Sequence, residues 1–195
     1  EILRIDGLDN IAIPTTIRIS PSVTTEERPA RWQEKIADLL AGQGYQEILT
    51  NSITNGAYYN EQESNELVRM INSLSQELDV MRPRLLETSL EVVAHNLNHK
   101  NGSLRLFEFG KTYRKVEGKY VENMMLGIWL SGRRNPESWN TSNDTVSFAD
   151  LKSSVENILR VAGINGWSCT STTTAQWSDG LQYSLGKKIV ARLGV

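Results

Sequence analysis

Apolar residues recur at helical spacing in three stretches of the chain. The first stretch carries them at i, i+4, i+7 and i+8, which places them on one helix face. These residues are Trp32, Ile36, Leu39 and Leu40. The predicted helix starts either at a capping box of Thr24 and Glu27 or at Pro29 itself. Gly42 and Gly44 follow this stripe and end the predicted helix.

The second and third stretches also predict helices with one apolar face. Pro83 is a favourable first helical residue, and the helix after it carries one apolar face made of Leu86, Leu90, Val93 and Leu97. Ser147 and Asp150 have capping-box spacing, so we predict that a third helix starts there and ends at Gly163. Its apolar stripe consists of Phe148, Leu151, Val155, Ile158 and Leu159.

Alternating segments rich in β-formers lie between these helices and predict strands. The predicted strands are Gln46–Thr54, Leu67–Ile71, Leu104–Phe109, Thr112–Val116, Val121–Leu130, Trp167–Thr173 and Gln182–Leu193. Glu117 and Gly118 predict a hairpin turn, and Gly110 predicts a bulge or a close backbone approach. Hairpin-linked strands with helices between them indicate an α+β fold, with a mainly antiparallel sheet and helices packed on it.

Composition and charge exclude several classes of protein. The chain is 39% hydrophobic and 23% charged with a net charge of −2, which is typical of a soluble domain without a large basic nucleic-acid footprint. Cys169 is the only cysteine, so we expect no intrachain disulfide, no clustered Cys/His zinc site and a reducing cytoplasm. Because the chain starts at Glu1 and closes on a strand-like run, we expect both ends to be cuts through a longer protein.

Motifs for nucleotide or hydrolytic chemistry are missing. The sequence contains no G-x-x-x-x-G-K-[ST], G-x-G-x-x-G, G-x-S-x-G or H-E-x-x-H pattern. His95 and His99 lie four residues apart on the second predicted helix. They are either a metal pair or one solvent-facing helix edge, and no third ligand stands nearby. Taken without any resemblance, the residues indicate a soluble α+β domain and no more.

One long block resembles a known family. The segment Met81–Tyr113 reads MRPRLLETSLEVVAHNLNHKNGSLRLFEFGKTY. It is similar to the β-subunit of bacterial phenylalanyl-tRNA synthetases, which carry "lR-x-x-LLPgLLe-x-v-x-x-N" and then "LFEiGrvf". The matching residues are Arg82, Leu85, Leu86, Leu90, Asn96, Leu106, Phe107, Glu108, Gly110 and Tyr113. Glu87 departs from the pattern, because the family favours proline there.

Three further blocks resemble the same family in the same order. They are Glu1–Asn10, Gly44–Thr54 and Ser147–Glu156. The resemblance implies that residues 1–19 are the end of a preceding domain with a linker. It implies that residues 20–195 are a degenerate copy of a class II synthetase catalytic domain, an antiparallel sheet flanked by helices.

The resemblance also implies that this domain is not catalytic. A class II site needs arginines that hold the phosphates of ATP. Only Arg105 and Arg114 lie on the strand pair that takes the place of motif 2, and they are either such ligands or surface strand residues. The motif 3 pattern is not found. In the family, ATP, phenylalanine and the 3′ end of tRNA are handled by the α-subunit.

The resemblance implies that the role of this domain is assembly with the α-subunit. The motif 1 elements of the two subunits pack together, and the matching residues here predict an interface made of Trp32, Ile36, Leu39 and Leu40, although Trp32 could equally be ordinary core. Glu1 matches a glutamate of a magnesium site shared with the α-subunit. For the whole enzyme the resemblance implies ATP, Mg²⁺, tRNA(Phe), an α2β2 heterotetramer and a cytoplasmic location, with no cofactor on this piece.

Two other functions remain open from the sequence. The chain could be a stand-alone class II-like enzyme that adenylates a small acid, which would need the missing arginines. It could also be a regulatory paralogue that binds an amino acid without reacting.

Overall fold

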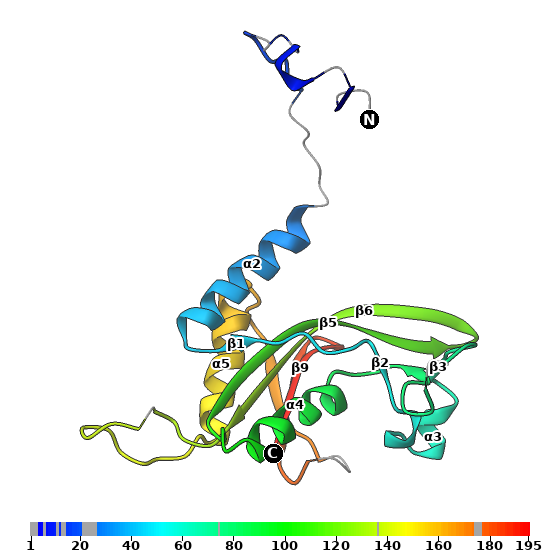
Figure 1. The fold of residues 1–195 in the computed structure, drawn as a ribbon. Coiled ribbons are helices and arrows are strands. Elements are labelled where there is room, and N and C mark those ends of the chain that lie inside the picture. Colours follow the sequence, from blue (N-terminus) through cyan, green and yellow to red (C-terminus); the bar gives the residue numbers. More distant parts are fainter. Residues whose placement is uncertain are drawn as a thin grey trace.

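The chain is described here by a computed structural model that covers residues 4–5, 7–10, 12, 15–20, 27–73, 75–135, 137–173 and 177–195. Helix α2 (Glu27–Gly42) leads from the N-terminal segment into the body of the molecule (Figure 1). The helix thus includes Pro29, and the Thr24 side of the predicted capping box lies outside the described residues. Short helical turns are η1 (Leu8–Asn10), η2 (Gly56–Tyr58) and α3 (Glu61–Ser64).

A long hairpin forms the centre of the body. Strands β5 (Leu104–Val116) and β6 (Lys119–Ser131) pair antiparallel along their whole length. Glu117 and Gly118 both have positive φ, at 48° and 79°, which suits a two-residue hairpin turn and confirms the predicted turn. The predicted break between Phe109 and Thr112 is wrong, because the register continues through Gly110 without a bulge.

The predicted strand Gln46–Thr54 is two strands in two sheets. Strand β1 (Gln46–Glu47) runs parallel to β5. After it the chain leaves this sheet, and β2 (Ile53–Thr54) joins a second sheet with β4 (Val80–Met81) and β3 (Val68–Arg69). The segment between β1 and β2 therefore bridges two sheets.

A third sheet follows helix α5 (Phe148–Val161). It consists of β7 (Ser168–Ser171), β8 (Gly180–Leu185) and β9 (Lys188–Gly194). The predicted strand Gln182–Leu193 is wrong as a single element, since the chain turns at Gly186, whose φ is 60°. The predicted capping box of α5 is confirmed, and hydrogen bonds from Ser147 lower the pKa of the Asp150 carboxyl to about 2.

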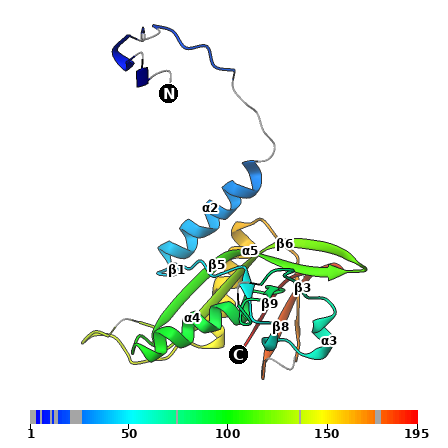
Figure 2. The same ribbon diagram turned by 45° about the vertical axis from the view of Figure 1, so that its right-hand side comes forward.

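Helices α2 and α5 pack against one end of the hairpin. Leu40 of α2 packs with Tyr45 and Phe107 in a core cluster that also contacts apolar side chains of β6 and α5. Figures 1 and 2 show α2 and α5 meeting at one end of the hairpin, where the Tyr45 hydroxyl lies 2.7 Å from Ser154 Oγ. The predicted α5 stripe is confirmed, because it packs on the third sheet around Leu159, Tyr183 and Leu193.

Helix α4 (Leu86–Asn98) differs from its prediction in two ways. It begins three residues after Pro83, with Leu85 at the N-cap position. Its expected apolar face is only partly buried, because Leu90 and Leu97 are exposed while Thr88 and Ser89 are buried. The helix turns this polar part of its surface inward, toward a group of charged side chains described below. In the described part of the chain, no helix is both long and apolar enough to span a membrane.

Candidate functional site

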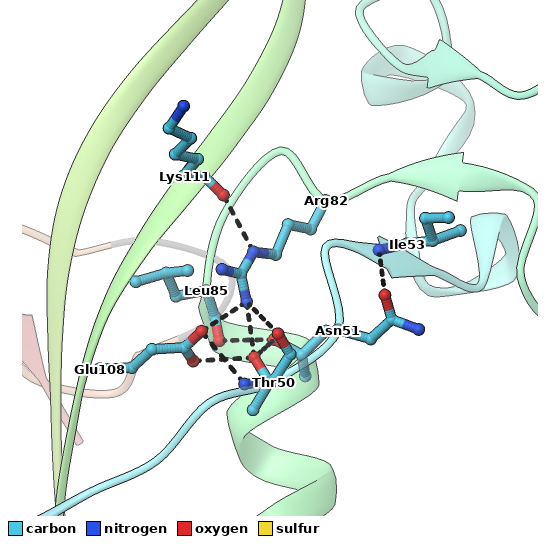
Figure 3. A network of polar contacts seen from close by, with 8 residues as sticks. Thr50, Asn51, Ile53, Arg82, Leu85, Glu108 and Lys111 are labelled. Carbon is cyan, nitrogen blue, oxygen red and sulfur yellow. Dashed lines mark hydrogen bonds and ion pairs between the residues drawn. The ribbon is translucent and has the colours of Figure 1, made fainter. Parts of the chain in front are cut away.

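Arg82 holds a charged network inside the body of the molecule. Its guanidinium lies between β5 and the segment that joins β1 to β2 (Figure 3). Arg82 Nη1 is 2.8 Å from Glu108 Oε1, and both side chains are almost fully buried. Arg82 Nε donates a hydrogen bond of 2.9 Å to the Lys111 carbonyl oxygen. The charge of each partner is thus neutralised where water cannot solvate it.

Thr50 completes this network from the opposite strand segment. Its hydroxyl accepts a hydrogen bond from Arg82 Nη1 at 2.6 Å and donates one to Glu108 Oε2 at 2.8 Å (Figure 3). Its backbone N–H donates to Glu108 Oε1 at 3.3 Å. Thr88 of α4 places its own hydroxyl 3.0 Å from that of Thr50. Both carboxylate oxygens of Glu108 therefore have partners, which offsets the cost of burying the charge.

Gly110 leaves the space that the guanidinium fills. A Cβ at this position would collide with Arg82 Nη2 and lie 2.7 Å from Leu85 Cδ2. The predicted close backbone approach at Gly110 is therefore confirmed, and the alternative of a bulge is wrong. No spacing or motif in the sequence predicted this network. The residue that could have indicated it is Glu108, a carboxylate that shares the inward face of β5 with Leu104 and Leu106 and therefore needs a buried partner.

An open cleft of about 540 Å³ lies beside the network. Thr50 and Thr88 belong to both, and the remaining walls come from η2, the chain before β4, and α4. Two carboxylates line it, Glu77 and Glu91, and no lysine or arginine stands among its described lining residues. The Tyr58 hydroxyl donates a 2.5 Å hydrogen bond to Glu91 Oε1, which raises the pKa of Tyr58 and keeps the phenol protonated.

The two arginines predicted as possible phosphate ligands do not come together. Arg105 Nη2 donates to the Arg134 carbonyl oxygen at 2.5 Å, and its guanidinium lies 5.9 Å from the centre of the Tyr45 ring. Arg114 forms a 3.4 Å ion pair with Glu66 on the surface. Each arginine is bound to other groups of its own chain, so the two side chains do not form a binding site for a triphosphate.

The predicted interface residues of α2 separate into two groups. Trp32 is 42% exposed, with the Lys35 ammonium 5.1 Å from its ring centre, so it is not ordinary core. Leu39 is half-buried. Ile36 packs against the core cluster, and Leu40 is 0% exposed within it. Leu40 therefore has no exposed surface in this chain, and its assignment to the interface stays a prediction.

The structure describes one of the two predicted metal sites. Glu1 lies outside the described residues, so the shared magnesium site stays a prediction. The rings of His95 and His99 lie 4.3 Å apart at the end of α4, and His99 Nδ1 is 2.8 Å from the His95 carbonyl oxygen. Across the described ranges, no group of three or more His, Cys, Asp or Glu side chains could hold a metal ion.

Comparison with known proteins identifies the family. Residues 13–195 match the family described as the phenylalanyl-tRNA synthetase β-chain CLM domain. The chain is 40% identical over 178 residues to the phenylalanine–tRNA ligase β subunit of Bacteroides thetaiotaomicron, which covers 85% of this chain and 22% of that protein. It is 37% identical over 207 residues to the same subunit of Porphyromonas gingivalis, covering 100% of this chain and 25% of that protein.

A solved structure confirms the fold class. The pyrrolysyl-tRNA synthetase of Desulfitobacterium hafniense aligns with a TM-score of 0.64 over 87% of this chain and 57% of that chain. Sequence identity to it is 20%, so the likeness shows the class II synthetase-like fold alone. The family match over most of the chain and the identity to the curated β subunits lead to one assignment. This chain belongs to the family of phenylalanyl-tRNA synthetase β-chain CLM domains.

Proposed function

We propose that this chain is a non-catalytic module of a phenylalanine–tRNA ligase, and that it supports assembly of the β chain with a catalytic α-subunit. The family assignment and the class II-like fold support the proposal. The chain spans 22–25% of the length of the curated relatives that it matches, so the module is one part of a longer protein in those relatives.

The observation that carries the proposal is the difference between the two ends of the apolar stripe of α2. Leu40, at the C-terminal end of the stripe, is buried in the core of the chain, whereas Trp32, at its N-terminal end, leaves a large aromatic surface exposed. Exposed tryptophans on a helix are frequent anchors of protein interfaces. We therefore assign the contact with the α-subunit to Trp32 and Leu39, with Ile36 at its inner edge.

The whole enzyme in this proposal is a cytoplasmic α2β2 heterotetramer that uses ATP and Mg²⁺ to attach phenylalanine to tRNA(Phe). Residues 1–19 are the end of the preceding domain with its linker, and residues 20–195 are the core module. Glu1 contributes to a magnesium site that is shared with the α-subunit, where a carboxylate oxygen suits the hard cation.

The arginine positions favour this function over a stand-alone adenylate-forming enzyme. Such an enzyme needs several fixed cations around the phosphates of ATP. Arg82 is buried against Glu108, and Arg105 and Arg114 bind groups of their own chain. The neighbouring cleft is acidic and would repel a triphosphate.

The test is co-purification of the full-length β chain with a tagged α-subunit. The double variant Trp32→Glu/Leu39→Glu places two charges on the proposed contact, and we expect it to lose the α-subunit completely. The matched control is Trp139→Glu, because Trp139 is almost fully exposed on the loop after β6 and lies outside the proposed contact. Retention of the α-subunit by a folded double variant at the wild-type level would disprove the assignment.

A further inference from the structure

We infer that the C-terminal end of α4 carries an open binding site for a divalent transition-metal ion that prefers imidazole ligands, such as Cu²⁺, Ni²⁺ or Zn²⁺. The ligands are His95 and His99, the two histidines of the whole chain. Neither residue belongs to the proposed contact with the α-subunit, so the inference goes beyond the proposed function and does not depend on it.

Helix α4 brings the two imidazole rings together. Residues four positions apart lie on the same helix face, one turn after the other. The ring centres of His95 and His99 are 4.3 Å apart, and the ring planes are tilted by 36°. Both side chains are exposed, so an ion can reach them from solvent and the rings can turn their nitrogens toward it. The helix thus holds two nitrogen ligands within reach of one ion.

A hydrogen bond of His99 selects the metal-binding form of its ring. His99 Nδ1 lies 2.8 Å from the His95 carbonyl oxygen, and a carbonyl oxygen only accepts hydrogen bonds, so Nδ1 carries the proton. In the neutral ring, Nε2 then keeps its lone pair. Histidines that bind metals almost always donate their other ring N–H to a carbonyl, a carboxylate or water. This hydrogen bond is independent of the spacing of the two histidines and indicates the same kind of ligand.

The backbone beneath the pair is fixed and favours a cation. Asn101 N–H donates to the Asn96 carbonyl oxygen at 3.0 Å, and Lys100 N–H donates to the Leu97 carbonyl oxygen at 2.9 Å. Lys100 has a φ of 63°, so these two bonds close α4 with a Schellman motif. The carbonyl end of a helix carries the negative pole of its dipole, which stabilises a bound cation.

Two protein ligands define an open site whose ion can exchange. Within the described residues no third His, Cys, Asp or Glu joins the pair, so water completes the coordination of the ion. Glu91 lies one turn before His95, but its Oε1 accepts a 2.5 Å hydrogen bond from the Tyr58 hydroxyl. Mg²⁺ prefers oxygen ligands, so this site is distinct from the magnesium site predicted at Glu1.

The test is calorimetric titration of the 195-residue chain with ZnCl₂ and CuCl₂. All proteins carry Cys169→Ser, which removes the single exposed thiol as a competing ligand. We expect one ion per chain, with Cu²⁺ bound more tightly than Zn²⁺. We expect His95→Ala to raise Kd at least ~10-fold, because loss of an outer-shell partner alone costs ~10- to 100-fold in metal affinity.

The matched control is His95→Ala/Ala94→His, which keeps both histidines and changes their spacing from four to five. Residues five apart do not share a helix face, so we expect this variant to bind as weakly as His95→Ala. Circular dichroism checks that each variant keeps its helix content. The inference is wrong if the control binds as tightly as the unshifted chain, or if the unshifted chain binds neither ion. Either result leaves co-purification with the α-subunit unchanged and the proposed function intact.

Discussion

Strand β5 contributes to two ion pairs that are nearly equal in length and opposite in surroundings. Arg82 Nη1 lies 2.8 Å from Glu108 Oε1, and Lys111 Nζ lies 2.6 Å from Glu122 Oε1. The side chains of the first pair are 3% and 1% exposed, and those of the second are both 49% exposed. The two pairs also touch, because the Lys111 carbonyl oxygen accepts a hydrogen bond from Arg82 Nε.

The comparison shows that distance alone does not set the contribution of an ion pair. An exposed pair exchanges water contacts for a flexible contact in a high dielectric, and it is screened by salt. A buried pair gains little net energy over an apolar pair of the same volume, but loss of one partner leaves a charge without solvation. The Arg82–Glu108 pair therefore makes the fold intolerant of changes on the inner face of β5.

The largest expected effect comes from breaking the buried pair. Glu108→Ala leaves the Arg82 guanidinium buried without its carboxylate, so we expect the free energy of unfolding to fall by about 3–5 kcal/mol, measured by urea denaturation. The apolar double variant Arg82→Met/Glu108→Leu removes both charges and should recover much of that loss. A loss below about 1 kcal/mol for Glu108→Ala would mean that water reaches the pair.

A smaller effect is expected from crowding the same pair. Gly110→Ala adds a methyl group against Arg82 Nη2 and Leu85 Cδ2, so we expect a loss of about 1–3 kcal/mol in the free energy of unfolding. Gly42→Ala at the end of α2 is the control, since a Cβ there meets nothing within 4 Å. Equal stability of the two variants would show that the backbone near Gly110 yields easily.

The smallest effect is expected at the exposed pair. Lys111→Gln removes the contact with Glu122, and we expect its urea unfolding curve to overlay that of the wild type. The comparison can be sharpened by repeating the measurement at high salt, where surface pairs are screened. A clear loss of stability in Lys111→Gln that disappears in salt would show that this surface pair matters more than its exposure indicates.

The sequence predicted elements whose signals are local. The apolar stripe of α5, its Ser147–Asp150 capping box and the Glu117–Gly118 turn are all present in the structure. Each depends on residues a few positions apart, so spacing alone was sufficient. The resemblance to β-subunits then led to the class II fold, which the family match and the structural comparison confirm.

Sequence patterns did not predict the features that depend on contacts between distant segments of the chain. The apolar face predicted for α4 is partly exposed because Thr88 is drawn inward to Thr50, which is 38 positions away. The strand predicted over Gln46–Thr54 divides because the Thr50 backbone N–H donates to the Glu108 side chain and not to the backbone of a neighbouring strand. Leu40 fitted an interface stripe by spacing, but the position of Phe107 makes it core. No periodicity within one segment contains this information.

Thr50 has a consequence for the cleft beyond its hydrogen bonds. Thr50 lines the cleft, and its hydroxyl is held in the interior by hydrogen bonds with Arg82 and Glu108. A wall that is already immobile loses little conformational entropy when a ligand arrives, so more of the contact energy is retained as affinity. The charged interior of the domain thereby preorganises its surface.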